Sequence, residues 1–101
     1  MTQKAIYTFA KWQVKEGQLQ LVLDLLTELA KKSASERGNL FYKINQSLSD
    51  THTLILFEGY KDETSLDEHR SSEHFRNLVI KKIIPLLEKR EVELTHEILL
   101  N

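Results

Sequence analysis

Residues 52–60 read HTLILFEGY. The apolar run Leu54–Phe57 places bulky side chains on both sides of an extended chain, which is typical of a strand in the middle of a sheet. The polar tract Ser49–Thr51 comes directly before it and favours a hairpin turn. We therefore expect a central strand over His52–Tyr60 that is buried on both faces.

Three further segments show the alternation of β-strands. Ala5–Val14 carries bulky side chains on both faces, with Tyr7 and Phe9 on one side and Trp12 on the other. Glu91–Leu99 alternates charged and apolar residues, which is typical of an edge strand. Between these two segments, the alternating apolar residues predict a strand with one face exposed to solvent. These residues are Leu40, Tyr42, Ile44 and Leu48.

Two segments have helical spacing instead. Apolar residues recur every three or four positions from Leu19 to Ala30, which predicts the first helix. Ser65 followed by Glu68 fits a capping box, so a short second helix is expected to begin there. Ser72 interrupts that helix and is positioned to cap its continuation, which Pro85 should end.

The predicted order of elements is β-α-β-β-α-β. This is the order of the α+β, ferredoxin-like split βαβ fold, an antiparallel sheet with both helices on one face and the first and third strands at its centre. We expect a single domain over residues 1–101. The apolar side chains on the uncovered face would meet water in a monomer, so a homodimer that packs sheet against sheet is expected from Tyr7, Phe9, Ile55 and Phe57.

Composition narrows the classes of function. The 101 residues carry a formal net charge of −1, which offers no cationic field for a nucleic acid or an anionic membrane. No apolar stretch approaches the roughly 20 residues of a membrane span, so we expect a cytoplasmic protein. The absence of cysteine excludes disulfides, thiolate nucleophiles and thiolate metal sites.

Candidate chemistry is concentrated at the end of the third strand and in the helix that follows. Glu58 and Tyr60 are followed by His69 and His74, which lie about 140° apart on an unbroken helix. The break at Ser72 could bring both imidazoles to one cavity, where either could act as general base or acid. The alternative is that His69 is solvated and His74 caps or packs.

His74 has a further reason to be considered. It precedes Phe75, which begins the apolar stripe of the helix, so we expect His74 to face the cavity. The positive end of the helix dipole would favour its neutral, basic form. A metal site built from His69, His74 and Glu58 remains open, but the spacing is not diagnostic, and we expect a protein without metal, flavin or haem. Glycine-rich phosphate loops, nucleophile elbows and HExxH motifs are absent.

A combined pattern extends along nearly the whole chain, through Gly38, Tyr42, Gln46, Asp50, Glu58, His69 and Ser72-x-His74-Phe75. In its order and spacing this pattern resembles the antibiotic biosynthesis monooxygenase (ABM) domains, whose members include quinol monooxygenases. The resemblance implies a dimeric α+β barrel with a pocket between sheet and helices. It also implies that O₂ oxidises an activated aromatic or quinol substrate without flavin, haem or metal.

Two departures from the family pattern affect the pocket. Tyr60 stands where many members have tryptophan, and Gly59 stands where an acid is common. Haem-degrading members of the family rely on an asparagine, a tryptophan and a histidine around the haem. Because the first strand here has no asparagine and Tyr60 replaces the tryptophan, haem degradation is not expected. Other members isomerise small phosphorylated carbonyl compounds.

The expected function is therefore a cofactor-independent monooxygenase of a small aromatic or quinol substrate. His69 or His74 is the expected base, and Tyr60, Glu58, Trp12 and Tyr42 are the expected substrate-binding residues. The alternatives are a small-molecule isomerase that uses the same acid–base pair, and a non-catalytic ligand-binding or interaction domain.

Overall fold

The computed structural model describes residues 4–100, and the ends of the predicted 1–101 domain, residues 1–3 and 101, lie outside it. The predicted element order is confirmed. In chain order the elements are β1 (Ile6–Val14), α1 (Leu19–Ala34), β2 (Asn39–Gln46), β3 (Thr53–Tyr60), α2 (Glu63–Arg70), the helical turns η1 (Phe75–Ile83) and η2 (Ile84–Leu86), and β4 (Leu87–Thr95). None of the described helices is long and apolar enough to cross a membrane.

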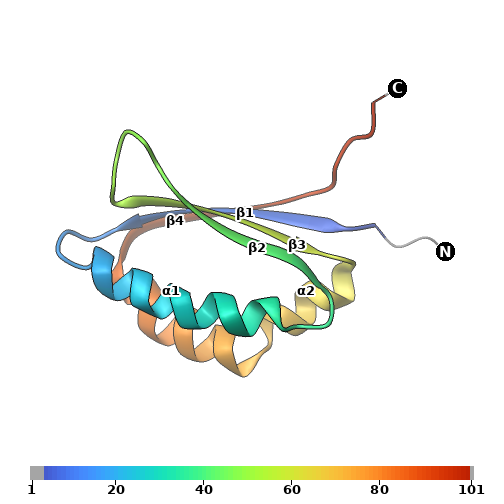
Figure 1. Cartoon of the computed structure of the whole chain (residues 1–101), viewed down its shortest axis with the longest axis horizontal. Coiled ribbons are helices and arrows are strands. Elements are labelled where there is room, and N and C mark those ends of the chain that lie inside the picture. Colours follow the sequence, from blue (N-terminus) through green and yellow to red (C-terminus); the bar gives the residue numbers. More distant parts are fainter. Residues whose placement is uncertain (1–3, 101) are drawn as a thin grey trace.

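The four strands form one antiparallel sheet in the order β2-β3-β1-β4. β1 and β3 are therefore the central strands, as predicted, and their register pairs Phe9 with Phe57 and Ala10 with Leu56. Helices α1 and α2 lie on the same side of this sheet (Figure 1). The fold is α+β and ferredoxin-like.

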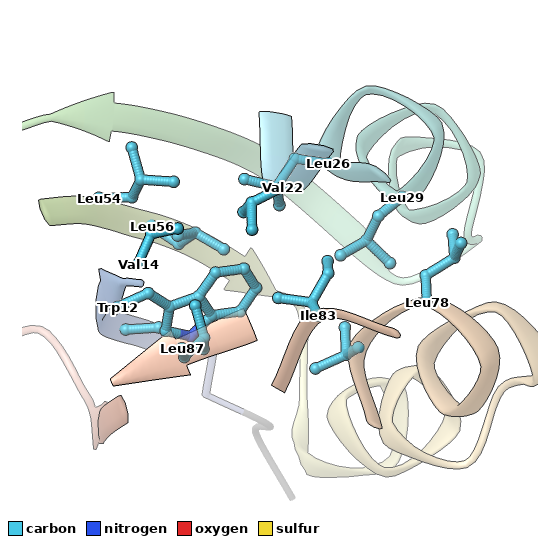
Figure 2. Packing of buried hydrophobic residues seen from close by; sticks show 12 residues of the cluster. Trp12, Val14, Val22, Leu26, Leu29, Leu54, Leu56, Leu78, Ile83 and Leu87 are labelled. Atoms are coloured by element: carbon cyan, nitrogen blue, oxygen red, sulfur yellow. The ribbon is translucent and has the colours of Figure 1, made fainter. Parts of the chain in front are cut away.

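The core fills the space between the sheet and the helices. Side chains at even positions of β1 point toward the helices, and Trp12 is 3% exposed there. Figure 2 shows Trp12 and Leu56 of the sheet facing Leu29 of α1 and Ile83 of η1. This confirms the predicted apolar faces of the central strands and of the first helix.

The opposite face of the sheet carries a group of four aromatic rings, Tyr7, Phe9, Phe41 and Phe57, which we call the aromatic face. The ring centroids of Phe9 and Phe57 lie 4.5 Å apart, and those of Phe41 and Phe57 lie 4.6 Å apart. Phe9 is 42% exposed in the single chain. The expected burial of β3 on both faces is therefore complete only on the helix side.

Several local expectations were wrong. Asp62, not Ser65, caps α2, because its side chain accepts the backbone N–H of Ser65 at 2.8 Å. A bulge in β2 after Asn39 turns Leu40 outward, and Leu48 lies beyond the end of the strand in an exposed position. The last strand spans Leu87–Thr95 rather than Glu91–Leu99.

Helical structure resumes after Ser72, as predicted. The Ser72 hydroxyl accepts the backbone N–H of Phe75 at 3.2 Å. η1 is a π-helix, with wider turns than an α-helix, and its final N–H, from Ile84, bonds to Val79 five residues back. Pro85 stands inside the short turn that ends the helical segment, in agreement with its predicted effect.

Gly38 fixes how closely the loop before β2 approaches α2. Its carbonyl accepts the N–H of Lys61 at 2.9 Å, and a Cβ at Gly38 would overlap both side-chain atoms of Ser65. Because the Ser65 Cβ cannot rotate away, Gly38→Ala should lower the free energy of unfolding by about 3 kcal/mol, the upper part of the range for overpacking. Urea denaturation measures this loss.

Gly17→Ala is the matched control. Gly17 has a positive φ of 81°, but a Cβ added there would meet no atom within 4 Å, so backbone strain alone should lower its unfolding free energy by about 1 kcal/mol. A larger loss for Gly17→Ala than for Gly38→Ala would contradict the steric explanation.

Candidate active site

A cavity of about 30 Å³ lies between the sheet and the second helical segment. Every strand contributes to its lining, together with α2 and η1. This volume holds one or two water molecules, so side chains at the mouth must move before an aromatic ring can enter. The polar and aromatic residues of the lining are Thr8, Trp12, Tyr42, Glu58, His69, Arg70, Phe75 and Arg90.

Glu58 and Tyr60 lie on the same face of β3 and are both buried. The Tyr60 hydroxyl donates to Glu58 Oε1 at 2.6 Å. Burial raises the pKa of Glu58 to about 7, the hydrogen bond from Tyr60 opposes the rise, and the charge of Glu36 adds to it. Burial and the neighbouring Glu58 raise the pKa of Tyr60, so Tyr60 remains a donor. Tyr60 stands behind Glu58, outside the cavity lining.

His69 lies on α2 between two carboxylates and is 3% exposed. Its Nδ1 is 3.0 and 2.9 Å from the two carboxylate oxygens of Glu36, and its Nε2 is 3.8 Å from Glu58 Oε1. Burial lowers the pKa of His69, while the hydrogen bond to Glu36 opposes the shift. Because the Glu36 carboxylate only accepts, it assigns the proton of the neutral ring to Nδ1 and leaves Nε2 with a lone pair.

The raised pKa of Glu58 should make stability depend on pH. Its ordinary pKa is 4.5, so the stabilisation is complete below that pH and is lost as pH rises through about 7. Between these limits wild type should lose on the order of 3 kcal/mol of unfolding free energy relative to Glu58→Gln, whose amide does not titrate. Urea denaturation from pH 4.5 to 8 measures the difference, and the lowered pKa of His69 largely cancels in it. A constant difference across that range would contradict a buried, titrating Glu58.

His74 approaches the same carboxylate from the outside. Its Nε2 lies 2.6 Å from Glu36 Oε2, and the rings of His74 and His69 are 6.1 Å apart. The break after α2 therefore brings the two histidines close to each other. However, His74 lines an outer groove with Asn77 and Glu28 and does not line the cavity. The expectation that it faces the cavity was wrong.

Glu36 was missed in the sequence, although it connects the two histidines. It lies in the loop after α1, where its N–H bonds to Ser33 and its carbonyl accepts the N–H of Asn39, both at 3.1 Å. A carboxylate just beyond the negative end of a helix dipole is unfavourable by itself. This unfavourable position is the feature of the sequence that could have indicated a stabilising partner for Glu36.

Glu36, His69 and His74 are also the described residues that could hold a cation, since their ligand atoms lie within 4.8 Å of one another. Two ligands around a tetrahedral zinc ion at 2.0–2.1 Å are about 3.3 Å apart. The 2.6 Å between His74 Nε2 and Glu36 Oε2 is shorter and matches a charge-assisted hydrogen bond. The arrangement is a hydrogen-bonded bridge that connects the outer groove with the cavity wall.

Trp12 and Tyr42 both line the cavity, where they were expected to contact substrate. Tyr42 is partly buried, and this desolvation together with the charges of Glu58 and Glu36 raises its pKa, so its hydroxyl stays protonated. Trp12 Nε1 and Thr8 Oγ1 are buried and have no hydrogen-bond partner among residues 4–100. A bound molecule or water can therefore satisfy both.

Comparison with known proteins shows the family to which the chain belongs. The profile of the antibiotic biosynthesis monooxygenase (ABM) family matches residues 5–80. The chain belongs to this family. The match runs from β1 into η1 and contains the acid–base residues of the candidate site, Glu36, Glu58, His69 and His74.

Individual relatives of the ABM chain agree in sequence and fold. A Bacillus subtilis protein named "Putative monooxygenase YcnE" is 28% identical over 69 residues, which cover 68% of this chain and 73% of the relative. A conserved protein from Methanosarcina mazei is 32% identical, with a TM-score of 0.87 over 93% of both chains. Rv0793 from Mycobacterium tuberculosis is 26% identical, with a TM-score of 0.82 over 96% of both chains.

Proposed function

We propose that this ABM protein is a cofactor-independent monooxygenase that acts on a small aromatic or quinol substrate with O₂. The observation that carries the proposal is the state of His69. It lines the cavity, Glu36 holds the proton on its Nδ1, and its Nε2 is available to accept another. A neutral imidazole held in one tautomer is the arrangement that a general base requires.

The proposed reaction uses the substrate as its own reductant. His69 Nε2 removes a proton from a phenolic hydroxyl, and the resulting anion transfers electrons to O₂. A carbon–oxygen bond then forms to give a substrate hydroperoxide. When the O–O bond breaks, one oxygen stays on the ring and the other leaves as water, so a quinol and O₂ yield a hydroxyquinone and H₂O.

Glu58 supplies a second proton-transfer group on the same wall of the cavity. With a pKa of about 7, both its protonated and ionised forms are populated at neutral pH. It can therefore donate the proton that the departing oxygen needs, while the Tyr60 hydroxyl keeps its carboxyl oriented. Two titrating groups in different environments divide the acid and base roles in many enzymes.

The isomerase alternative uses these same groups without O₂. Removing a proton beside a carbonyl and returning it to the neighbouring carbon needs only a base and an acid, which His69 and Glu58 can provide. A non-catalytic domain would bind a ligand without turnover. These three functions give different results in a single assay of oxygen dependence.

The proposed assembly is a homodimer that packs through the aromatic face. In a single chain this face leaves Phe9 and the neighbouring rings in contact with water, although isolated proteins seldom expose large apolar patches. A second copy of the same face would cover it by two-fold symmetry. The cavity lies on the other side of the sheet and stays accessible in such a dimer.

A ligand screen followed by an oxygen assay tests the proposed function. Thermal shift against quinols, polyphenols and phosphorylated ketoses identifies compounds that stabilise the protein. For a quinol that stabilises it, we expect consumption of one O₂ per product molecule. Turnover that continues under argon would support the isomerase, and stabilisation without turnover would support a binding domain.

Glu36→Gln should lower kcat by roughly 10²-fold. The amide offers one acceptor oxygen where the carboxylate serves two histidines, so His69 loses its fixed tautomer. Without the charge and hydrogen bond that raise the pKa of His69, the acid limb of the kcat/KM profile should move to lower pH. Glu28→Gln, at an exposed position of α1, is the control and should leave kcat and the acid limb of the profile unchanged. An unshifted acid limb in Glu36→Gln would show that Glu36 does not act through His69.

A further inference from the structure

Two arginines lie at the mouth of the cavity. Arg70 is the last residue of α2, and Arg90 lies on the edge strand β4. The register pairs Arg90 with Trp12, and residues directly opposite in an antiparallel pair point to the same face. Trp12 is buried on the helix side, so Arg90 extends to that side also, where both arginines line the cavity.

Neither arginine has an ion-pair partner among the described residues, although the charge of Glu58 acts on both at longer range. Within the part of the chain that the structure describes, no carboxylate lies within 4.0 Å of Arg70 or Arg90. The nearby acids are engaged, Glu58 with Tyr60 and Glu36 with the histidines. Desolvation at the cavity mouth lowers the pKa of Arg90 and the charge of Arg70 lowers it further, while the charges of Glu58 and Tyr42 oppose the shift.

The cavity also presents buried hydrogen-bond donors. The indole N–H of Trp12 can only donate, and the Thr8 hydroxyl can donate as well, yet neither has a partner in residues 4–100. Trp12 is 3% exposed and Thr8 is 5% exposed, so bulk water does not reach them freely. An unsatisfied buried donor destabilises the folded protein, and a ligand oxygen that accepts from it would remove that cost.

We infer that the substrate carries an oxyanion, a carboxylate or a phosphate monoester, which Arg70 and Arg90 bind at the cavity mouth. Guanidinium groups pair with both anions through two parallel hydrogen bonds. An aromatic ring anchored there extends inward toward His69, and its oxygen substituents meet the N–H of Trp12. This inference rests on the proposed function in one respect, namely that the cavity is the substrate site.

A matched series of three small aromatic compounds tests the inference on the full-length protein. Hydroquinone is neutral, 2,5-dihydroxybenzoate adds a carboxylate, and 4-hydroxyphenyl phosphate carries a phosphate in place of one hydroxyl hydrogen. Calorimetric titration at low salt should give at least a roughly tenfold lower Kd for one of the anions than for hydroquinone, which corresponds to the net contribution of one charged hydrogen bond. The tighter anion identifies the acidic group.

Three variants assign the preference to the arginines. Arg70→Gln and Arg90→Gln should each remove most of it, whereas Lys89→Gln should keep it. Lys89 is the neighbour of Arg90 on β4, pairs with Gln13, and points to the opposite face of the sheet. Both arginines are exposed, so the variants should keep the wild-type melting temperature.

The outcomes separate this inference from the proposed function. Equal affinities for the three compounds, no binding of either anion, or a preference that survives both arginine variants would overturn the oxyanion site, even if hydroquinone drives O₂ uptake. Arginine-dependent anion binding with no O₂ uptake by any compound would support the oxyanion site and count against the monooxygenase.

Discussion

His69→Asn should lower kcat by roughly 10²- to 10⁴-fold on a validated substrate, the usual scale for the loss of a general base. His69 is the one imidazole among the described residues that line the cavity. The asparagine amide can still donate to Glu36 in place of Nδ1, but it has no basic nitrogen in place of Nε2. Proton removal should therefore be lost while the packing around the site is largely kept.

The measurement is initial O₂ uptake as a function of substrate concentration, with the melting temperature as a check on folding. His74→Asn is the informative comparison, since His74 reaches the cavity only through Glu36 and should lose less than about tenfold. His52, on the hairpin beside Thr51, should be dispensable. A larger loss for His74→Asn than for His69→Asn would move the base to His74, and full activity of both would exclude acid–base catalysis here.

Phe9→Glu should convert the proposed dimer into a monomer at micromolar concentration. Phe9 stacks on Phe57, whose ring contacts the other three rings of the aromatic face, and Phe9 is the most exposed ring of the two central strands. In a two-fold interface the substitution acts twice: it removes about 1.5–3 kcal/mol of apolar burial per side chain and places two carboxylates in the contact. The loss of apolar burial alone, about 3–6 kcal/mol for the two side chains, corresponds to a roughly 10²- to 10⁴-fold higher dissociation constant, and the two carboxylates raise it further.

Light scattering gives the result as a molar mass near that of one chain, 11.8 kDa. Gln20→Glu adds the same charge on exposed α1, away from the sheet, and should leave the dimer intact. The cavity lies behind the sheet, so the Phe9→Glu monomer should still bind ligands of the site. A wild-type protein that is already monomeric, or a dimeric Phe9→Glu variant, would exclude this interface.

The central part of the fold could be predicted because burial there depends on local alternation. Tyr7, Trp12 and the Leu54–Phe57 run show which sides of the central strands are apolar, and the structure confirms them. The bounds of the elements were harder to predict in exposed segments, where no pattern of buried side chains marks the strand. β4 begins at Leu87, but the run of four charged residues Glu88–Glu91 shows no alternation that would separate strand from loop.

Competing local signals explain the other errors. Asp62 and Ser65 are both good capping residues, and only the backbone path decides which one caps the helix. The bulge that turns Leu40 outward comes from pairing with β3, so the spacing within β2 alone does not reveal it.

The acid–base part of the candidate site was predictable only where its residues are close in sequence. Glu58, Tyr60, His69 and His74 fall within one short stretch, and the structure brings all of them together. Glu36 precedes His69 by 33 residues and lies in a loop, so no periodicity relates the two. Its position became visible only when the fold placed the end of α1 beside α2.

The small volume of the cavity also affects the rate at which a ligand can enter it. A space for one or two waters does not accept an aromatic molecule on first collision. Opening must come first, through side-chain rotation at the rim or a small displacement of η1, on timescales from nanoseconds to milliseconds. Capture should therefore depend on how often the protein opens as well as on diffusion, and after closure the proposed reaction would proceed in a compartment with almost no solvent.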